Sequence, residues 1–195
     1  MAILELTNDW LANPPWTSGN ADFDINAAVA PDLTMTAGRL HIAAPSGSAN
    51  YLRAASSGPY DVNGIFVIQC SAKKDTSDFI FFEVDSWTIP ASNTRAWFNL
   101  ATGVIGNKTA GIISHSMVAE GNGWHRCQAQ FQLGPSDVSG VIGFALADSN
   151  GDSTPSAAVS IFVHGARIGN IVLDPAIGSK GGPGLSFGSM GKMGA

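Results

Sequence analysis

Apolar and polar residues alternate along most of the chain with the period of two that is typical of β-strands. The alternation predicts strands over residues 38–44, 63–73, 77–87, 94–100, 110–120, 123–133, 139–148, 157–168 and 170–174. Turn residues separate these runs, among them Ala-Thr-Gly at 101–103 and Gly-Asn-Gly at 121–123. Residues 24–30 fit a helical turn or two, which Pro31 ends. This pattern predicts an all-β fold, an antiparallel β-sandwich.

The run after the Gly-Asn-Gly turn shows how one strand divides its residues between two faces. The more continuous apolar face, which we expect in the core, consists of His125, Cys127, Ala129 and Phe131, whereas Trp124, Arg126, Gln128 and Gln130 share the other face. Trp124 and Arg126 lie two residues apart on that face, so we expect a cation–π pair. Cys70 also lies in an apolar alternating run. Both cysteines are therefore predicted to be buried free thiols, which argues against a catalytic Cys127.

The pattern changes after Pro175, which divides the chain into a sandwich domain at residues 1–175 and an arm at residues 176–195. The arm is rich in glycine and cannot bury enough apolar surface to fold alone. Its isolated apolar residues are Leu185, Phe187, Met190 and Met193. We expect these four side chains to contact a neighbouring subunit.

Composition narrows the classes of partner. Charged residues make up 13% of the chain, about half the usual share, and the formal net charge is −5. The few cations are scattered, which argues against nucleic-acid binding. No apolar run is long enough for a membrane span, and the first ten residues do not resemble a signal peptide.

Two acidic sequence patterns are candidates, one for a catalytic acid pair and one for a calcium site. Glu83 and Asp85 fall on one face of a strand, about 7 Å apart, and EVDSWT at 83–88 is similar to the Glu-x-Asp-x-x-Glu strand of one jelly-roll glycosidase family. In that family the third acid of the pattern donates the proton, and here Thr88 stands at its position, so hydrolysis is not expected. Both acids are instead predicted to lie on a solvent face. Asp148, Asn150 and Asp152 have the spacing of a calcium loop without its Gly and Glu, which favours an Asx turn over a loose calcium site.

No other catalytic or cofactor pattern is present. The four histidines do not show zinc spacing, and neither a nucleophile elbow nor a P-loop occurs, so no cofactor is expected. The tryptophans offer candidate glycan contacts. Trp87 ends a predicted strand and is the best candidate for exposure, while Trp97 and Phe98 point to opposite faces, one in the core and one partly exposed.

Five segments in order carry a resemblance to a known family. They are VAPDLTMTAGRL at 29–40, FVIQCSAKKD at 66–75, WFNLATGVIGN at 97–107, GNGWHRCQAQF at 121–131 and SIFVHGARI at 160–168. Between Trp10 and Asp174 the chain thus resembles the jelly-roll, carbohydrate-binding-module-like domains of bacteriophage virion proteins. His125, His164 and Arg167 stand where the family often has Tyr, Trp and Gln, which weakens the expectation of glycan binding.

The resemblance implies a non-enzymatic structural protein of the virion, assembled in the host cytoplasm. Among such roles we expect a capsid decoration, or cement, protein, because the chain is short for a fibre and has no heptads or repeats to build a shaft. The expected partners are other virion proteins and further copies of the chain. The alternatives are a tail-fibre or appendage subunit and a glycan-binding module for host recognition.

Overall fold

The computed structural model describes residues 16–45, 51–57, 65–87, 93–134, 137 and 139–171. These residues form twelve strands and no helix, which confirms the all-β prediction. Neighbouring strands pair antiparallel throughout, and they form two six-stranded sheets. Because the described part has no helix, no helix in it could span a membrane.

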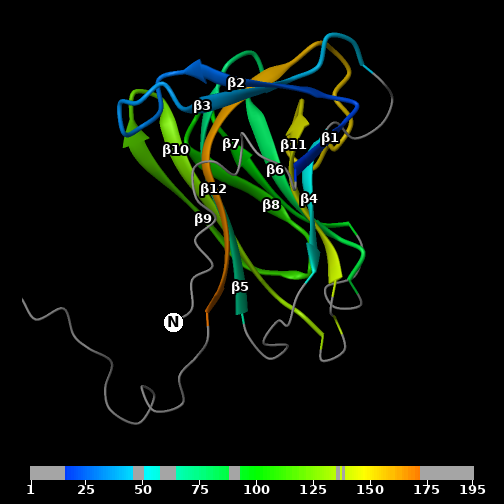
Figure 1. Cartoon of the computed structure of the whole chain (residues 1–195). Coiled ribbons are helices and arrows are strands. Elements are labelled where there is room, and N and C mark those ends of the chain that lie inside the picture. The colour runs from blue at the N-terminus through cyan, green and yellow to red at the C-terminus, as the bar shows by residue number, and fades with distance from the viewer. Residues whose placement is uncertain are drawn as a thin grey trace, which may run out of the picture.

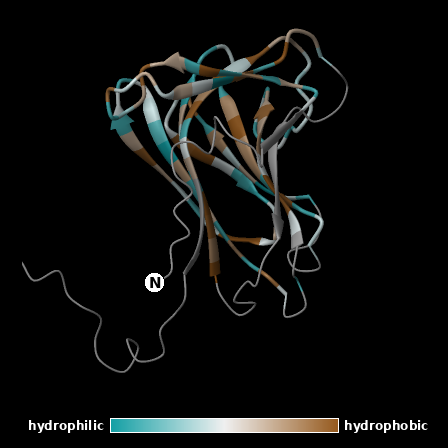
Figure 2. Cartoon of the chain, in the orientation of Figure 1, coloured by the Kyte–Doolittle hydropathy of each residue, from teal (hydrophilic) through white to brown (hydrophobic). Residues whose placement is uncertain are grey.

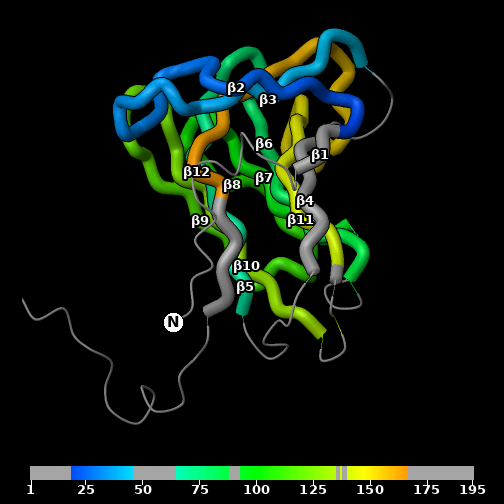
Figure 3. The backbone as a smooth tube through the Cα atoms, viewed as in Figure 1, coloured from blue at the N-terminus to red at the C-terminus, as the bar shows by residue number. Residues whose placement is uncertain are grey.

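The two sheets face each other as the layers of a β-sandwich (Figures 1 and 3). Sheet A has the order β1 (Trp16–Gly19), β4 (Tyr51–Ser57), β11 (Ser139–Ala147), β6 (Phe79–Asp85), β7 (Thr94–Asn99) and β8 (Val104–Lys108). Sheet B has the order β2 (Asp22–Ala28), β3 (Ala37–His41), β12 (Ser160–Ile171), β5 (Ile65–Lys74), β10 (Trp124–Gln132) and β9 (Ile112–Gly121). This confirms the predicted antiparallel sandwich of the jelly-roll class.

The main core lies between the sheets and follows directly from the alternation. In β5 every second side chain from Phe66 to Ala72 is buried. The neighbouring strand β10 of the same sheet buries Cys127, Ala129 and Phe131. Sheet A supplies the facing aromatic layer, in which Phe82 packs against Phe98, Phe144 and other core residues. Figure 2 shows hydrophobic and hydrophilic residues alternating along the strands.

The expected helical turn at 24–30 is wrong, because residues 24–28 belong to β2 and residues 29 and 30 follow it without helical structure. Asp22, Phe23 and Asp24 pair with β3, and Ala28 pairs with it again after an irregular stretch. Within that stretch Asn26 has a φ of 53°. The positive φ bends the strand, so its residues do not keep the strict alternation by which a strand is recognised.

Three further strands were not predicted, and one predicted break is absent. β1, β4 and β8 lack a clear alternation, and the side chains of β8 are mostly exposed at the edge of sheet A. The single strand β12 (Ser160–Ile171) runs through the predicted break at residue 169, with an irregularity between His164 and Arg167, and residues 172–174 of the last predicted strand lie outside the described residues. The two predicted tight turns are confirmed. Gly103 donates to the Asn99 carbonyl, and all three residues of Gly121–Gly123 have a positive φ.

Both cysteines are free and buried, as predicted. Cys70 in β5 and Cys127 in β10 are direct partners in the strand register. Burial in the apolar core raises the pKa of the Cys70 thiol well above its usual range, and the same desolvation raises the pKa of Cys127. Neither thiol is prepared for nucleophilic chemistry.

The arm lies outside the described residues, as do the predicted contact residues Leu185, Phe187, Met190 and Met193. The boundary between a domain at 1–175 and an arm at 176–195 therefore stays a prediction. The described part of the chain ends with Ile171, the last residue of β12.

Candidate functional site

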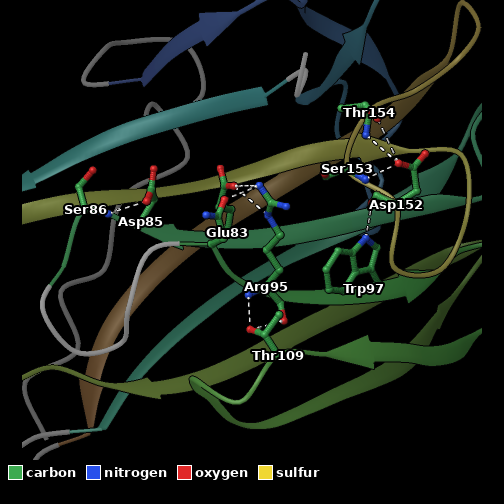
Figure 4. Close-up of polar contacts among 10 residues, drawn as sticks. Glu83, Asp85, Ser86, Arg95, Trp97, Thr109, Asp152, Ser153 and Thr154 are labelled. Atoms are coloured by element: carbon green, nitrogen blue, oxygen red, sulfur yellow. Dashed lines mark hydrogen bonds and ion pairs between the residues drawn. The ribbon is translucent and has the colours of Figure 1, made fainter. Parts of the chain in front are cut away.

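The outer face of sheet A holds the acid that the sequence singled out, and that acid is part of an ion pair. Glu83 on β6 stands opposite Arg95 on β7, and the Arg95 Nε and Nη2 atoms donate to Glu83 Oε1 over 2.9 Å and 2.6 Å (Figure 4). The Glu83 side chain is only 2% exposed. The Arg95 guanidinium also lies 5.3 Å from the centre of the Phe81 ring. This carboxylate is neutralised by its partner.

The prediction that Glu83 and Asp85 share a solvent face is therefore wrong for Glu83. Asp85 is half-buried, and its Oδ1 accepts the Ser86 amide over 2.8 Å. The two acids do lie on one side of β6, as Figure 4 shows, but they differ in environment. Thr88, the position of the missing proton donor, lies outside the described residues.

Trp97 and Phe98 point to opposite faces of sheet A, as predicted, but both are buried. Phe98 belongs to the main core, whereas Trp97 forms a smaller cluster on the outer face. There the Trp97 ring stacks on Phe81 with 5.5 Å between centroids, and its Nε1 donates to the Asp152 carbonyl over 2.5 Å (Figure 4). The 148–156 loop covers the indole, so only 4% of Trp97 is exposed.

The expectation that Trp87 is exposed is also wrong. β6 ends at Asp85, and Ser86 then adopts a φ of 63°, which turns the chain inward. Trp87 joins the main core with 5% exposure and lies flat against Gly140, where a Cβ atom would be 2.0 Å from the indole. Its Nε1 donates to the Val141 carbonyl over 3.4 Å. Neither glycan candidate offers an open ring face.

The 148–156 loop uses its acidic and amide oxygens for backbone contacts. Asp148 Oδ2 accepts the Ser156 amide at 2.5 Å, Asn150 Oδ1 accepts the Asn107 amide at 2.6 Å, and Asp152 Oδ1 accepts the amides of the next two residues. These bonds are what the Asx-turn interpretation expects. No cluster of three or more His, Cys, Asp or Glu placed to hold a metal ion occurs among the residues that the structure describes.

Trp124 fastens a turn to the outer face of sheet B. Its indole is buried with Ala30 and Ala37, and Ala28 and Phe162 pack around them. The expected cation–π pair with Arg126 is wrong, because no such contact joins the two side chains in the described part of the chain. The Arg126 guanidinium lies instead 3.6 Å from the Glu120 carboxylate. Trp124 thus anchors the segment between β2 and β3, which we name the 29–36 turn.

Hydrogen bonds within the 29–36 turn give it a defined shape. Ala30 donates its amide to the Thr34 carbonyl, and Leu33 donates to the Ala30 carbonyl, at 2.7 Å and 3.0 Å. Asp32 Oδ1 accepts both the amide and the hydroxyl of Thr34. These bonds lower the pKa of Asp32, with the Thr34 hydroxyl as the largest cause. The turn has no need of a bound ligand to hold it together.

His164, which stands where the resembled family often has Trp, supports the same turn from β12. Its Nδ1 lies 3.3 Å from Thr36 Oγ1, and its Nε2 lies 3.7 Å from Asp32 Oδ2. His164 is almost fully buried. The side chain of Arg167 is outside the described residues. The substitution at 164 therefore builds a polar support for the turn in place of an aromatic platform.

Among the residues that the structure describes, large apolar side chains are exposed in two regions, and the 29–36 turn belongs to one of them. Leu33 at its tip is 75% exposed and has a φ of 67°, an uncommon conformation for a leucine. Together with Leu33, the exposed residues Ile25, Val29 and Met35 form what we call the apolar surface. The second region is formed by β8 and β9, the end strands of the two sheets, with Val104, Ile105, Ile113 and Val118.

The apolar surface was not predicted from the sequence. A signal was present, since Leu33 and Met35 are set among Pro31, Asp32 and Thr34, which favour a turn and leave no strand face to bury them. Reading 24–30 as a helical stub hid the connection between Ile25 and this turn. The exposure itself depends on Trp124, which lies about ninety residues further along the chain.

No protein-family model matches the chain, and no curated protein matches it. Among solved structures, the chain is similar in fold to the enzymatically active domain of tailspike protein 4 from bacteriophage CBA120, with 15% identity and a TM-score of 0.49 over 87% of this chain and 22% of that one. A CBM4 structure matches with 13% identity and a TM-score of 0.42 over 69% of this chain and 71% of that one.

A third similar structure comprises the CBM22-1 and GH10 modules of endo-1,4-β-D-xylanase 10B from Clostridium thermocellum, complexed with xylohexaose. It has 10% identity and a TM-score of 0.47 over 88% of this chain and 28% of that one. The chain therefore spans less than a third of the tailspike and xylanase chains. At these identities and TM-scores the likenesses add nothing to the β-sandwich architecture that the strand order already shows.

Proposed function

We propose that the protein is a non-enzymatic structural subunit of a bacteriophage virion, specifically a capsid decoration protein that binds neighbouring subunits. The observation that carries this proposal is the apolar surface on a hydrogen-bonded turn. Large exposed apolar side chains on and beside a turn that its own hydrogen bonds hold in shape are typical of protein contact sites. The phage setting rests on the five sequence segments that resemble virion proteins.

The state of one acid and of both cysteines supports a non-enzymatic role. Glu83 is paired with Arg95, and Cys70 and Cys127 are buried with raised pKa values. A general acid or a nucleophile must instead reach its substrate in a suitable protonation state. The fold serves here as a scaffold for contact surfaces.

Labelling of particles tests this proposal. An antibody against the full chain is applied to purified particles of the phage that encodes it, and bound gold is located by electron microscopy. Labelling distributed over the head supports capsid decoration. Labelling confined to the tail would replace decoration with the appendage alternative, and particles without the protein would overturn the virion role.

One observation favours glycan binding as a second candidate. Gln69 on β5, Gln128 on β10 and Ser116 on β9 are register partners, so they form a polar row across sheet B. Within the described residues neither amide side chain has a hydrogen-bond partner, and both are half-buried. Amides and hydroxyls in a row can bond sugar hydroxyls.

A glycan array with the full chain separates the two candidates. The second candidate expects a hit that the variant Gln128→Ala weakens and that Leu33→Asn leaves unchanged. The first candidate expects no such hit, because its contacts lie on the apolar surface. A hit that neither variant changes would place the glycan at another site.

A further inference from the structure

The apolar surface is also acidic. Residues 21–36 include Asp22, Asp24 and Asp32 and no Lys or Arg. Asp24 and Asp32 are about half exposed. His41 Nε2 lies 3.0 Å from Asp24 Oδ2 and His164 Nε2 lies 3.7 Å from Asp32 Oδ2, and in the described part of the chain neither Lys nor Arg forms an ion pair with Asp24 or Asp32. A ligand for this surface would combine apolar side chains with positive charge.

The arm of this chain has that chemistry. Residues 176–195 contain Lys180 and Lys192 and no acidic side chain, and they carry apolar residues separated by glycine and serine. Leu185, Phe187, Met190 and Met193 are the apolar ones that the sequence analysis expected to contact a partner. Glycine-rich spacing lets an extended segment follow the shape of a surface without steric conflict. The arm and the apolar surface are thus complementary in charge and in hydrophobicity.

The direction of β12 places its last residue far from the apolar surface. β12 begins beside β3, with Ser160 opposite His41, and ends at Ile171, opposite Ile65. Figure 1 shows β2 and β3 at one end of the sandwich and the end of β12 at the other. The length of β12 separates these ends by roughly 30 Å. Ile171, the last described residue before the arm, therefore lies at the end of the sandwich remote from the apolar surface.

We propose that the arm of one copy docks on the apolar surface of a second copy, with its lysines beside Asp22, Asp24 and Asp32. This inference rests on the proposed structural role and gives it a specific contact. The 29–36 turn is shaped before binding by its own hydrogen bonds and by Trp124, so only the arm loses conformational freedom on docking. A contact of this small size is weak between two molecules and becomes strong when many copies are held together on a particle.

Self-association of the full chain provides the test. Sedimentation equilibrium is measured from about 10 μM to about 1 mM, the range in which weak contacts are populated. The surface variant is Leu33→Asn, because asparagine tolerates the positive φ and removes the apolar side chain. The arm variant is Leu185→Ser with Phe187→Ser. The control is Val104→Ser, which removes a similarly exposed apolar side chain from β8.

The expected result has two parts. The full chain and the Val104→Ser control self-associate equally, while the surface and arm variants each lose about tenfold or more in association constant. Mixing the surface variant with the arm variant then restores association as a one-to-one complex, because each supplies the part that the other lacks. Restoration on mixing is the result that an arm exchanged between copies requires.

Three results would overturn the inference. They are a full chain that stays monomeric at the highest concentration, association that both variants leave unchanged, and loss in both variants without restoration on mixing. The last result would place the arm on its own chain. None of the three affects head labelling in the particle experiment, so failure of this contact is distinguishable from failure of the proposed function.

Discussion

Leu33 combines a strained, positive φ with a largely exposed apolar side chain. The left-handed backbone region costs an ordinary residue about 1–2 kcal/mol, whereas asparagine enters it at lower cost. Since Leu33 is mostly exposed, replacing it removes little packing from the folded chain. Strain of this kind at a surface position is often connected with function.

The variant Leu33→Asn is therefore expected to be more stable than the native chain, by about 0.5–1 kcal/mol, which corresponds to a rise in Tm of about 2 °C for a chain of this size. Calorimetry measures the change. Met35→Asn is the matched control, since Met35 is exposed but does not have a positive φ, and it should give no gain. A loss of stability in Leu33→Asn would show that the leucine packs within its own chain.

Asp32 makes the 29–36 turn sensitive to acid. Its pKa is lowered, first by the Thr34 hydroxyl, then by the Thr34 amide and, more weakly, by His164. A lowered pKa in the folded state means that the bonds stabilise the turn above the pKa of the unfolded chain, about 3.9, and are lost as the pH falls through the folded value.

We expect the Thr34 amide resonance to titrate with a midpoint below about 3.9 in an NMR series. In Thr34→Val, which lacks the hydroxyl, the Asp32 midpoint should move upward because the largest cause of the shift is gone. An unchanged midpoint in that variant would contradict the assigned cause.

The ion pair between Glu83 and Arg95 allows a comparison of buried and exposed charges. The variant Arg95→Ala removes two charge-assisted hydrogen bonds from the buried Glu83 carboxylate, and losing bonds to a charged group typically costs about 1.5–3 kcal/mol. Arg126→Ala breaks the more exposed pair with Glu120 and should cost at most about 1 kcal/mol. Urea unfolding measures both, and equal costs would show that the Glu83 site is hydrated in solution.

At the scale of the strand, prediction from the sequence succeeded where one face of an element meets the core. β5 and β10 alternate because their inner side chains must be apolar and their outer ones face solvent. β8 was not predicted, because an exposed edge strand has no buried face and therefore does not need alternating apolar and polar residues. In β2 the positive φ at Asn26 interrupts the alternation, so the sequence suggested a helical stub.

The burial of Trp87 and Trp97, the candidate glycan contacts, could not be predicted from the alternation for a different reason. The position of Trp87 depends on the backbone angle of Ser86 and on the absence of a side chain at Gly140. The burial of Trp97 depends on the 148–156 loop, more than fifty residues away in sequence. Alternation assigns a residue to a face of a sheet, but the covering of that face is a tertiary property.

The two cysteines are unreactive toward thiol reagents as long as β5 and β10 stay paired and buried in the core. Cys70 and Cys127 are buried direct partners, and burial raises the pKa of each thiol. In the native protein at pH 8 we therefore expect no reaction with a thiol-specific reagent over the time in which the unfolded chain reacts with two equivalents. Mass spectrometry counts the modified thiols, and rapid labelling of the native chain would mean that β10 separates readily from β5.

At the scale of the whole molecule, the described residues form three buried clusters that stabilise different parts of the fold. The main core joins the two sheets, while the smaller clusters around Trp97 and Trp124 lie on the outer faces. Each of these tryptophans fastens one connection between strands, the 148–156 loop and the 29–36 turn respectively. Removing an outer anchor should therefore release its own connection and leave the main core in place.

Hydrogen exchange on the variant Trp124→Ala tests this division. The amides of Ala30 and Leu33, which bond within the 29–36 turn, should exchange much faster than in the native chain, while the core amides of β5 keep their relative protection. Trp97→Ala should instead accelerate the amides of Asp152 and Ser156 in the other loop. If Trp124→Ala accelerated every region equally, the outer clusters would belong to one cooperative unit with the core. The apolar surface would then depend on the stability of the whole sandwich, and its contacts would be lost only on global unfolding.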